Sequence, residues 1–393
     1  MTDPIIISPY ARTPMGGFQG ALSGVTATRL GSIAVKAAVE RSGCPLDAID
    51  RIYMGCVLPA GLGQAPARQA ALGANLPESI EATTINKMCG SGMQATIMAA
   101  EALASGGADV VIAGGMESMT NAPYALPKHR GGARIGHDRI IDTMMMDGLE
   151  DAYEKGKAMG AFAQLTAEDY QFTREAMDAY AIESLTRANN AITSAAFTDE
   201  VVSVAITVRG GETIVTQDEQ PGKAKPDKIP SLKPAFAKDG TITAASSASI
   251  SDGAAALVLT RASVAQELHL KQEARLVATA AHAHAPALFT TAPVFAIRKV
   301  LDKAGWSIDE VDLFEVNEAF AAVAMIAMHD LAIPHHKINV NGGATALGHP
   351  IGSSGARIIV TLIAALKARN LKKGVAALCI GGGEATAVAV ELV

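Results

Sequence analysis

The chain has 393 residues, which is enough for two or three domains or for one large fused unit with a sizeable core. Hydrophobic residues make up 49%, charged residues 18%, and the net charge is -6. This balance excludes a globally basic protein drawn to nucleic acid or to an anionic membrane surface, and it indicates a compact, oligomeric enzyme.

Short apolar runs alternate with helical patterns in the first part of the chain. A strand is predicted over residues 5–7 and a helix over 28–41, which a Ser-Gly pair closes. Three more apolar runs, at 51–58, 81–88 and 109–115, are bounded by glycine or polar residues and predict strands. This alternation favours a buried sheet covered by helices.

The pattern changes between residues 119 and 243, where Pro, Gly, His and Lys become frequent and one amphipathic helix is predicted over 173–192. This region is interpreted as an insertion. The alternation then returns in four runs, at residues 248–260, 274–281, 311–328 and 374–392. The most apolar stretch, 356–368, is too short to cross a bilayer and predicts a buried helix.

The two regular parts are similar in size, and each has a cysteine beside a glycine-rich turn, which suggests an internal duplication. We therefore predict an N-terminal half formed by residues 1–118 and 244–268, a loop domain over 119–243, and a C-terminal half over 269–393.

The sequence contains four cysteines, none in C-x-x-C spacing: Cys44, Cys56, Cys89 and Cys379. The first residues lack the basic start and long apolar stretch of a signal peptide. We expect a cytoplasmic protein with free thiols.

Cys89 lies where a predicted strand turns into a predicted helix. The positive end of the helix dipole and nearby backbone N–H groups are expected to lower its pKa from about 8.5 toward neutrality. Gly90 and Gly92 would let a substrate carbonyl approach closely. Taken alone, the residue is better explained as a small core side chain at a tight turn, and only its neighbours and a partner base favour a nucleophile.

Three other positions could share a site with Cys89. His349 lies in a long polar, glycine-rich loop, where packing explains a histidine poorly. Cys379 ends an apolar strand and enters three consecutive glycines, so that a backbone amide such as that of Gly381 could face a ligand. Asn317 lies at a strand-to-helix junction and is either a helix N-cap or a site residue.

Several familiar cofactor patterns are missing from the sequence. There is no G-x-G-x-x-G with a downstream acidic residue and no G-x-x-x-x-G-K-[ST], so neither a dinucleotide nor a P-loop nucleotide site is supported. The remaining candidate histidines lack partners at metal-ligand spacing, and we predict no metal site: His282, His284, His335 and His336.

At this point the motifs together resemble the thiolase family, closest to its acetyl-CoA acetyltransferases. The resemblance runs end to end through residues 11–23, 61–71, 86–95 (NKMCGSGMQA), 113–124, 251–259, 317–320 (NEAF), 341–357 (NGGATALGHPIGSSGAR) and 379–383 (CIGGG). It implies an α/β thiolase fold, five-layered αβαβα, built from two similar mixed-sheet halves with an inserted loop domain. It also implies a homotetramer formed as a dimer of dimers.

The resemblance also implies a reaction mechanism and the residues that carry it out. Cys89 attacks an acyl-CoA while His349 takes the thiol proton, and the acyl group is held as a thioester. Cys379 then removes an α-proton from a second acetyl-CoA, and the enolate attacks the acyl-enzyme. One oxyanion hole comes from His349 and a water held by Asn317, and the other from the backbone amides of Cys89 and Gly381.

Acetyl-CoA, acetoacetyl-CoA and CoA are the implied substrates and products, with no permanently bound cofactor and no nucleic-acid or membrane partner. The substrate-binding positions carried over from the family are Met159, Lys223, Phe236, Ala248, Ser249, Phe289, Ala319 and Phe320. The lysine-rich stretch 223–238 either attracts CoA phosphates or is a solvated loop.

The chain departs from many family members at three of these regions. Ala158 precedes Met159-Gly160 where many short-chain members have histidine, Ala248 replaces a pantetheine-contacting serine, and Phe289 replaces a methionine beside the acyl pocket. A bulky ring at 289 favours short acyl groups.

Three other functions are weighed against this one. The first is a broader-range 3-ketoacyl-CoA thiolase of fatty-acid breakdown. The second is a ketoacyl synthase of the related condensing family, which Cys379 argues against. The third is a non-catalytic acyl-CoA-binding or lipid-binding protein, which would be expected to have lost the catalytic positions.

Overall fold

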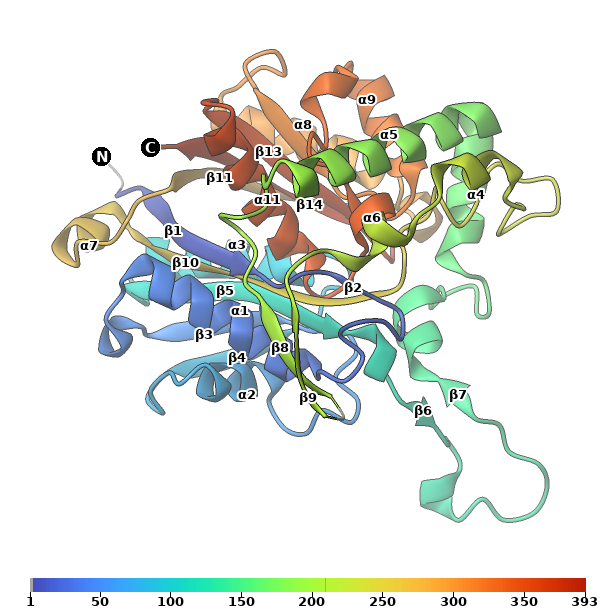
Figure 1. Cartoon of the computed structure of the whole chain (residues 1–393), viewed down its shortest axis with the longest axis horizontal. Coiled ribbons are helices and arrows are strands. Elements are labelled where there is room, and N and C mark those ends of the chain that lie inside the picture. Colours follow the sequence, from blue (N-terminus) through green and yellow to red (C-terminus); the bar gives the residue numbers. More distant parts are fainter. Residues whose placement is uncertain (1–2, 209) are drawn as a thin grey trace.

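The N-terminal part of the main sheet is built from strands that alternate with helices along the chain. The computed structural model, which describes residues 3–208 and 210–393, places them side by side (Figure 1). In spatial order they are β1 (Ile5–Arg12), β10 (Ser251–Arg261), β5 (Val110–Ser118), β3 (Arg51–Gly55) and β4 (Glu81–Ile85), with β2 (Gly16–Gly17) paired to β10. The β1/β10 and β10/β5 pairs are antiparallel, whereas β3 is parallel to both β5 and β4. The strands predicted in this part are confirmed.

The C-terminal part of the sheet mixes strand directions in the same way. In spatial order it contains β11 (Ala274–Ala283), β14 (Glu384–Leu392), β13 (Lys373–Ile380) and β12 (Leu313–Val316), with only the β12/β13 pair parallel. Three residues of β1, Ile5 to Ile7, pair with β11 and join the two parts. The two mixed-sheet halves are confirmed, and their hydrogen bonding is continuous through this junction.

Helices form three layers around the two parts of the sheet. In the middle lie α3 (Ser91–Ala104) and α11 (Ser354–Ala368), which contact each other and both parts of the sheet. The N-terminal part is covered on its outer face by α1 (Ala27–Ser42) and α2 (Pro66–Gly73), and the C-terminal part by α8 (Ala292–Ala304), beside which lies α9 (Ala321–Leu331). The predicted five-layered αβαβα arrangement is therefore confirmed (Figure 1).

The inserted region between the two halves has more regular structure than its sequence predicts. Its helices are α4 (Met159–Asp169), the predicted amphipathic α5 (Arg174–Thr193) and the short α6 (Glu219–Lys223). Two hairpins accompany them: β6 (Tyr124–Ala125) with β7 (Ile141–Asp142), and β8 (Val204–Val208) with β9 (Gly211–Val215). The β6–β7 arm projects away from the body of the molecule (Figure 1). The boundaries 1–118, 119–243 and 269–393 stay a prediction.

Two further α-helices are short: α7 (Ala262–Glu267) after β10, and α10 (Ala344–Leu347) before α11. Within residues 3–208 and 210–393, no helix has the length and apolar character needed to cross a membrane.

The two central helices approach each other more closely than most helix pairs can. A Cβ atom at Gly92 would lie 2.8 Å from the backbone nitrogen of Ala356, and one at Gly355 would lie 2.4 Å from the backbone nitrogen of Met93. Both glycines are therefore required by space rather than by backbone conformation. Because the contact lies at the first turns of α3 and α11, the segments that enter the two helices converge.

We predict that Gly355→Ala destabilises the fold by about 1–3 kcal/mol, because the added methyl group must push two packed helices apart. Its thermal unfolding midpoint should fall by several degrees. Gly24→Ala is the matched control, because a Cβ there would meet only Ile206, at 4.0 Å. Equal midpoints for the two variants would show that the close approach of the helices is not a constraint.

Candidate active site

A narrow pocket opens where the first turns of α3 and α11 meet the end of β13. Its volume is about 90 Å³. Both halves and the inserted region contribute to its wall: Cys89, Met119, Gly148, Leu149, Met159, Ala248, Ser249, Ile250, Phe289, Ala319, Phe320, His349, Ile351, Cys379 and Gly381. Ten of the positions singled out in the sequence thus lie together, although they come from segments up to 292 residues apart: Cys89, Met159, Ala248, Ser249, Phe289, Ala319, Phe320, His349, Cys379 and Gly381.

Cys89 lies on a sharp turn between β4 and α3. The preceding residue, Met88, has a positive φ of 47°, which is uncommon for a residue with a side chain and marks a constrained backbone. The turn is fixed from within, because Ser91 accepts a hydrogen bond from the Lys87 amide at 2.9 Å and donates one to the Met88 carbonyl at 2.6 Å. A Cβ at Gly90 would lie 2.3 Å from Ile380 Cδ1, so the turn also rests directly on the end of β13.

The thiol of Cys89 is not acidified by its position before α3. Withdrawal from water raises its pKa to about 11, and the backbone amide of Gly381 opposes this only in part. The expected shift toward neutrality is therefore wrong. The physical reason is that the sulfur faces an apolar pocket in which a helix end offers partial charge but no counter-ion. A base must remove the proton during the reaction.

Cys379 is the second thiol in the pocket, at the end of β13. Burial raises its pKa, and so does the nearby Cys89. The glycine turn that follows, with Gly382 and Gly383 at φ of 97° and 87°, brings the Gly381 amide back toward the Cys89 sulfur. A high thiol pKa means that the Cys379 thiolate, once formed, is a strong base.

His349 presents one ring nitrogen to the pocket and fixes the other against α11. Its Nδ1 lies 2.6 Å from Ser354 Oγ, and the Ser354 hydroxyl lies 3.0 Å from the Pro350 carbonyl, which can only accept. We therefore assign the proton to Nδ1, which donates to Ser354, and leave Nε2 as the acceptor. Nε2 is buried and has no partner among the described residues.

The imidazole of His349 is neutral across the physiological range. Burial lowers its pKa to about 3, and the positive charge of the buried Arg357 on α11 lowers it further. A neutral imidazole with an unpartnered Nε2 can accept a proton from a thiol in the same pocket.

Asn317 lies behind His349 at the junction of β12 and α9. Phe320, and not Asn317, is the N-cap of α9, so the side-chain amide is free for another role. Its Nδ2 lies 3.5 Å from His349 Nδ1, and its Oδ1 is buried with no partner among the described residues. A buried amide with spare hydrogen-bonding capacity could hold a water molecule at this place.

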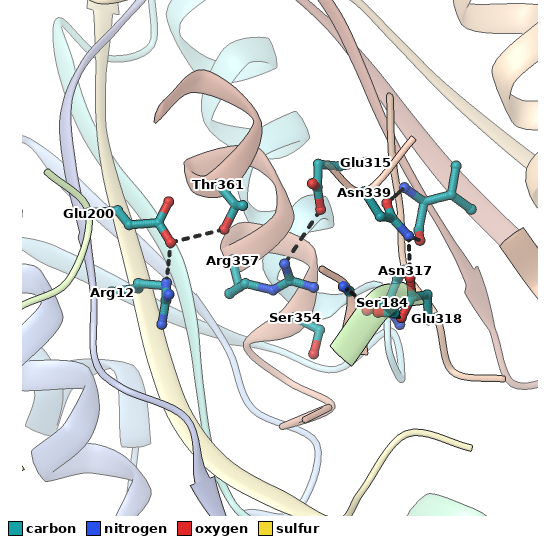
Figure 2. Close-up of polar contacts among 12 residues, drawn as sticks. Arg12, Ser184, Glu200, Glu315, Asn317, Glu318, Asn339, Ser354, Arg357 and Thr361 are labelled. Carbon is teal, nitrogen blue, oxygen red and sulfur yellow. Dashed lines mark hydrogen bonds and ion pairs between the residues drawn. The ribbon is translucent and has the colours of Figure 1, made fainter. Parts of the chain in front are cut away.

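Buried carboxylates hold the segments that carry these groups. Glu318 accepts hydrogen bonds from Tyr180 and Ser184 on α5, and also from Asn339 and Thr345. Figure 2 shows Ser184 and Asn339 beside it. On the opposite side, Glu117 accepts from three backbone amides, those of Val57, Leu58 and Gly352. The loop of His349 is thereby tied to both halves of the protein.

A buried polar seam continues along α11 away from the pocket (Figure 2). Arg357 lies 3.5 Å from Glu315 of β12, and Thr361 donates to Glu200 at 3.2 Å. Glu200 also pairs with Arg12 at 2.5 Å. Sequence reasoning missed the roles of Ser354 and Arg357, which follow His349 by five and eight residues. Arg357 lies in the predicted apolar helix 356–368, where a charged side chain was a usable signal.

The lysine-rich stretch lines a second groove, with a volume of about 370 Å³, that shares Ser249 with the narrow pocket. Lys223, Lys225 and Lys228 lie on it, but Lys223 is also paired with Glu219. Phe236 lines neither space and packs edge to face on Phe320, with ring centroids 5.8 Å apart. The groove therefore adjoins the narrow pocket at Ser249 and has three lysine side chains along its wall.

Comparisons with known proteins agree with one another. The model of the thiolase N-terminal domain matches residues 5–263 and that of the thiolase C-terminal domain matches residues 270–392. A probable acetyl-CoA acetyltransferase of Dictyostelium discoideum is 48% identical over 99% of this chain and 94% of its own length. The crystal structure of the Bacillus anthracis acetyl-CoA acetyltransferase is 40% identical, with a TM-score of 0.96 and coverage of 100% of this chain and 99% of that one. The Ascaris suum Acat5 thiolase in complex with coenzyme A is 42% identical, with a TM-score of 0.93 over 99% of this chain and 100% of that one.

The raised pKa of Cys89 predicts a pH dependence of its alkylation. Because the folded-state pKa lies near 11, the thiolate fraction should rise about tenfold per pH unit from pH 7 to 10. Iodoacetamide labelling, located by peptide mass spectrometry, should follow this rise, and Cys89→Ala should lose the labelled peptide. A rate that levels off below pH 8.5 would instead mean that α3 or a charged His349 stabilises the thiolate.

Proposed function

The chain belongs to the thiolase family, and we propose that it acts as an acetyl-CoA C-acetyltransferase, which reversibly condenses two molecules of acetyl-CoA to acetoacetyl-CoA and CoA. One observation carries this proposal. Two thiols, a neutral imidazole acceptor and an inward-facing backbone amide meet in one narrow pocket, at Cys89, Cys379, His349 and Gly381. This set supplies a nucleophile, two bases and an oxyanion donor for chemistry at a thioester carbonyl.

In the first half-reaction, Cys89 Sγ attacks the carbonyl carbon of acetyl-CoA. The thiol proton passes to His349 Nε2 and from there to the departing CoA sulfur, so that CoA leaves as a thiol and the acetyl group remains on Cys89. The backbone amides of Cys89 and Gly381 donate to the carbonyl oxygen as negative charge develops on it. One such donor is worth about 3 to 4 kcal/mol of barrier.

In the second half-reaction, Cys379 passes its thiol proton to His349 Nε2, and the resulting thiolate removes a proton from the α-carbon of a second acetyl-CoA. The protonated His349 Nε2 and a water held by Asn317 donate hydrogen bonds to the enolate oxygen. The α-carbon attacks the acetyl-Cys89 carbonyl, the new carbon-carbon bond forms, and the Cys89 sulfur–carbon bond breaks as His349 Nε2 returns its proton to the Cys89 sulfur. Holding both reactants in one pocket removes much of the entropic cost of this step.

The small volume of the pocket supports a preference for short acyl groups. About 90 Å³ is well below the 300–1,000 Å³ typical of sites for drug-sized ligands. Phe289 and Phe320 close one wall, and their ring centroids lie 6.3 Å apart. This favours acetoacetyl-CoA over the longer substrates of a broad-range 3-ketoacyl-CoA thiolase, and the intact set of catalytic groups argues against a protein that only binds acyl-CoA or lipid.

CoA itself is proposed to lie in the groove lined by Lys223, Lys225 and Lys228, with its thioester end passing Ser249 into the pocket. The lysine ammonium groups suit the phosphates of CoA. No permanently bound cofactor is needed for this chemistry.

Assembly and location are part of the same proposal. The β6–β7 arm carries large apolar side chains in solvent, with Tyr124 and Ile140 both 67% exposed and Ile135 99% exposed. Such a surface supports burial against other copies of the chain in a homotetramer. Four free thiols suit the reducing cytoplasm.

The test is thiolytic turnover of acetoacetyl-CoA, 2-methylacetoacetyl-CoA and longer 3-ketoacyl-CoAs by the wild type and by Cys89→Ala. We expect cleavage of acetoacetyl-CoA, a steep fall with chain length, and loss of all turnover in Cys89→Ala. A wild-type protein that cleaves none of these substrates would show the proposed function to be wrong.

Cys379→Ser separates the two half-reactions in the same assay. It should still take up a labelled acetyl group from acetyl-CoA on Cys89 while losing condensation. Loss of the labelling step would contradict the division of roles between the two thiols.

A further inference from the structure

An ion pair joins the two half-sites beside the thiols. Lys87 Nζ contacts Glu384 Oε2, and the two residues are separated by 297 positions in the sequence. Lys87 lies two residues before Cys89, and Glu384 lies three residues after Gly381. Each partner is thus only one short turn away from a catalytic group of its own half.

Both partners are fixed firmly to those turns. The Lys87 amide donates to Ser91, and the Lys87 carbonyl accepts from the Gly90 amide at 3.0 Å. Glu384 begins β14 and pairs with Ile380 at the end of β13. A shift of either residue therefore moves the Cys89 turn or the glycine turn as a unit.

Two contacts between the turns, one apolar and one ionic, fix their relative position in different ways. Ile380 rests against Gly90, where a Cβ would lie 2.3 Å from it, and this apolar contact sets how closely the turns approach. An apolar contact opposes a lateral displacement of the two turns only weakly, whereas an ion pair favours one relative position of its two charged groups. The Lys87 and Glu384 side chains are 25% and 36% exposed, so water shields their attraction only in part.

We propose that Lys87 and Glu384 are positioning residues, which hold the Gly381 amide and Cys379 in register with Cys89 across the boundary between the two halves. The inference rests on the proposed function. Neither residue lines the narrow pocket or the lysine-lined groove in the described structure, so neither is expected to bind substrate. Displacement of a reacting group by about 1 Å can cost up to 10²-fold in rate.

The experiment measures thiolysis of acetoacetyl-CoA by Lys87→Met, Glu384→Gln and the reversed pair Lys87→Glu/Glu384→Lys. Each single variant should lower kcat by about 10- to 100-fold and leave KM within about twofold, and the reversed pair should recover kcat to within about threefold of the wild type. Acetyl labelling of Cys89 should slow in the single variants, because the Gly381 amide serves that step.

The matched control is the Lys373–Glu310 pair at the other end of β13, whose side chains are 25% and 49% exposed. Lys373→Met should change the thermal midpoint as much as Lys87→Met does, with kcat unchanged. The inference is overturned if the single variants at 87 and 384 keep wild-type kcat, raise KM alone, or lose kcat only in proportion to folded protein. An inactive wild type would reject the proposed function instead, which separates the two failures.

Discussion

The close contact between the first turns of α3 and α11 is the constraint on which the site depends. Gly92 and Gly355 leave no room for side chains between the helices, and a Cβ at Gly115 would lie 2.0 Å from the Gly352 carbonyl. The loop of His349 therefore packs directly against β5 and α3, which belong to the N-terminal half of the site. Cys89 and His349 meet because each enters one of these helices, and neither could move without opening the centre of the fold.

The environment of this contact decides the chemistry. Burial keeps the Cys89 thiol protonated, with a pKa near 11, and His349 uncharged, with a pKa near 3. Because Cys89 and His349 are both uncharged at rest, negative charge develops only when a thioester carbonyl is present to accept it. The buried carboxyl groups that hold the loops, Glu117 and Glu318, satisfy their oxygens with protein donors and so stay out of the reaction.

Much of the fold and part of the site could be predicted from the sequence. The period of the apolar pattern placed α1 and α5, and the continuous apolar stretch 356–368 placed α11. The Cys and Gly positions with the family resemblance identified the pocket residues that the structure brings together. The pKa of Cys89 was predicted in the wrong direction, because a helix end is a local feature whereas desolvation depends on segments hundreds of residues away. Lys87 and Glu384 were missed for the same reason, since their contact exists only once the two halves are joined. Ser354 was missed although it lies only five residues after His349, in the same half.

The central claim is that an uncharged His349 takes the proton of Cys89 as the acetyl group arrives. The most direct test is the rate of Cys89 acetylation by acetyl-CoA in His349→Asn, followed from pH 7 to 10.5. Loss of the base should slow the step by about 10²- to 10⁴-fold at pH 7. The deficit should shrink as the pH approaches the thiol pKa, because the thiolate then forms without help. A His349→Asn protein that is acetylated at the wild-type rate at pH 7 would contradict the account.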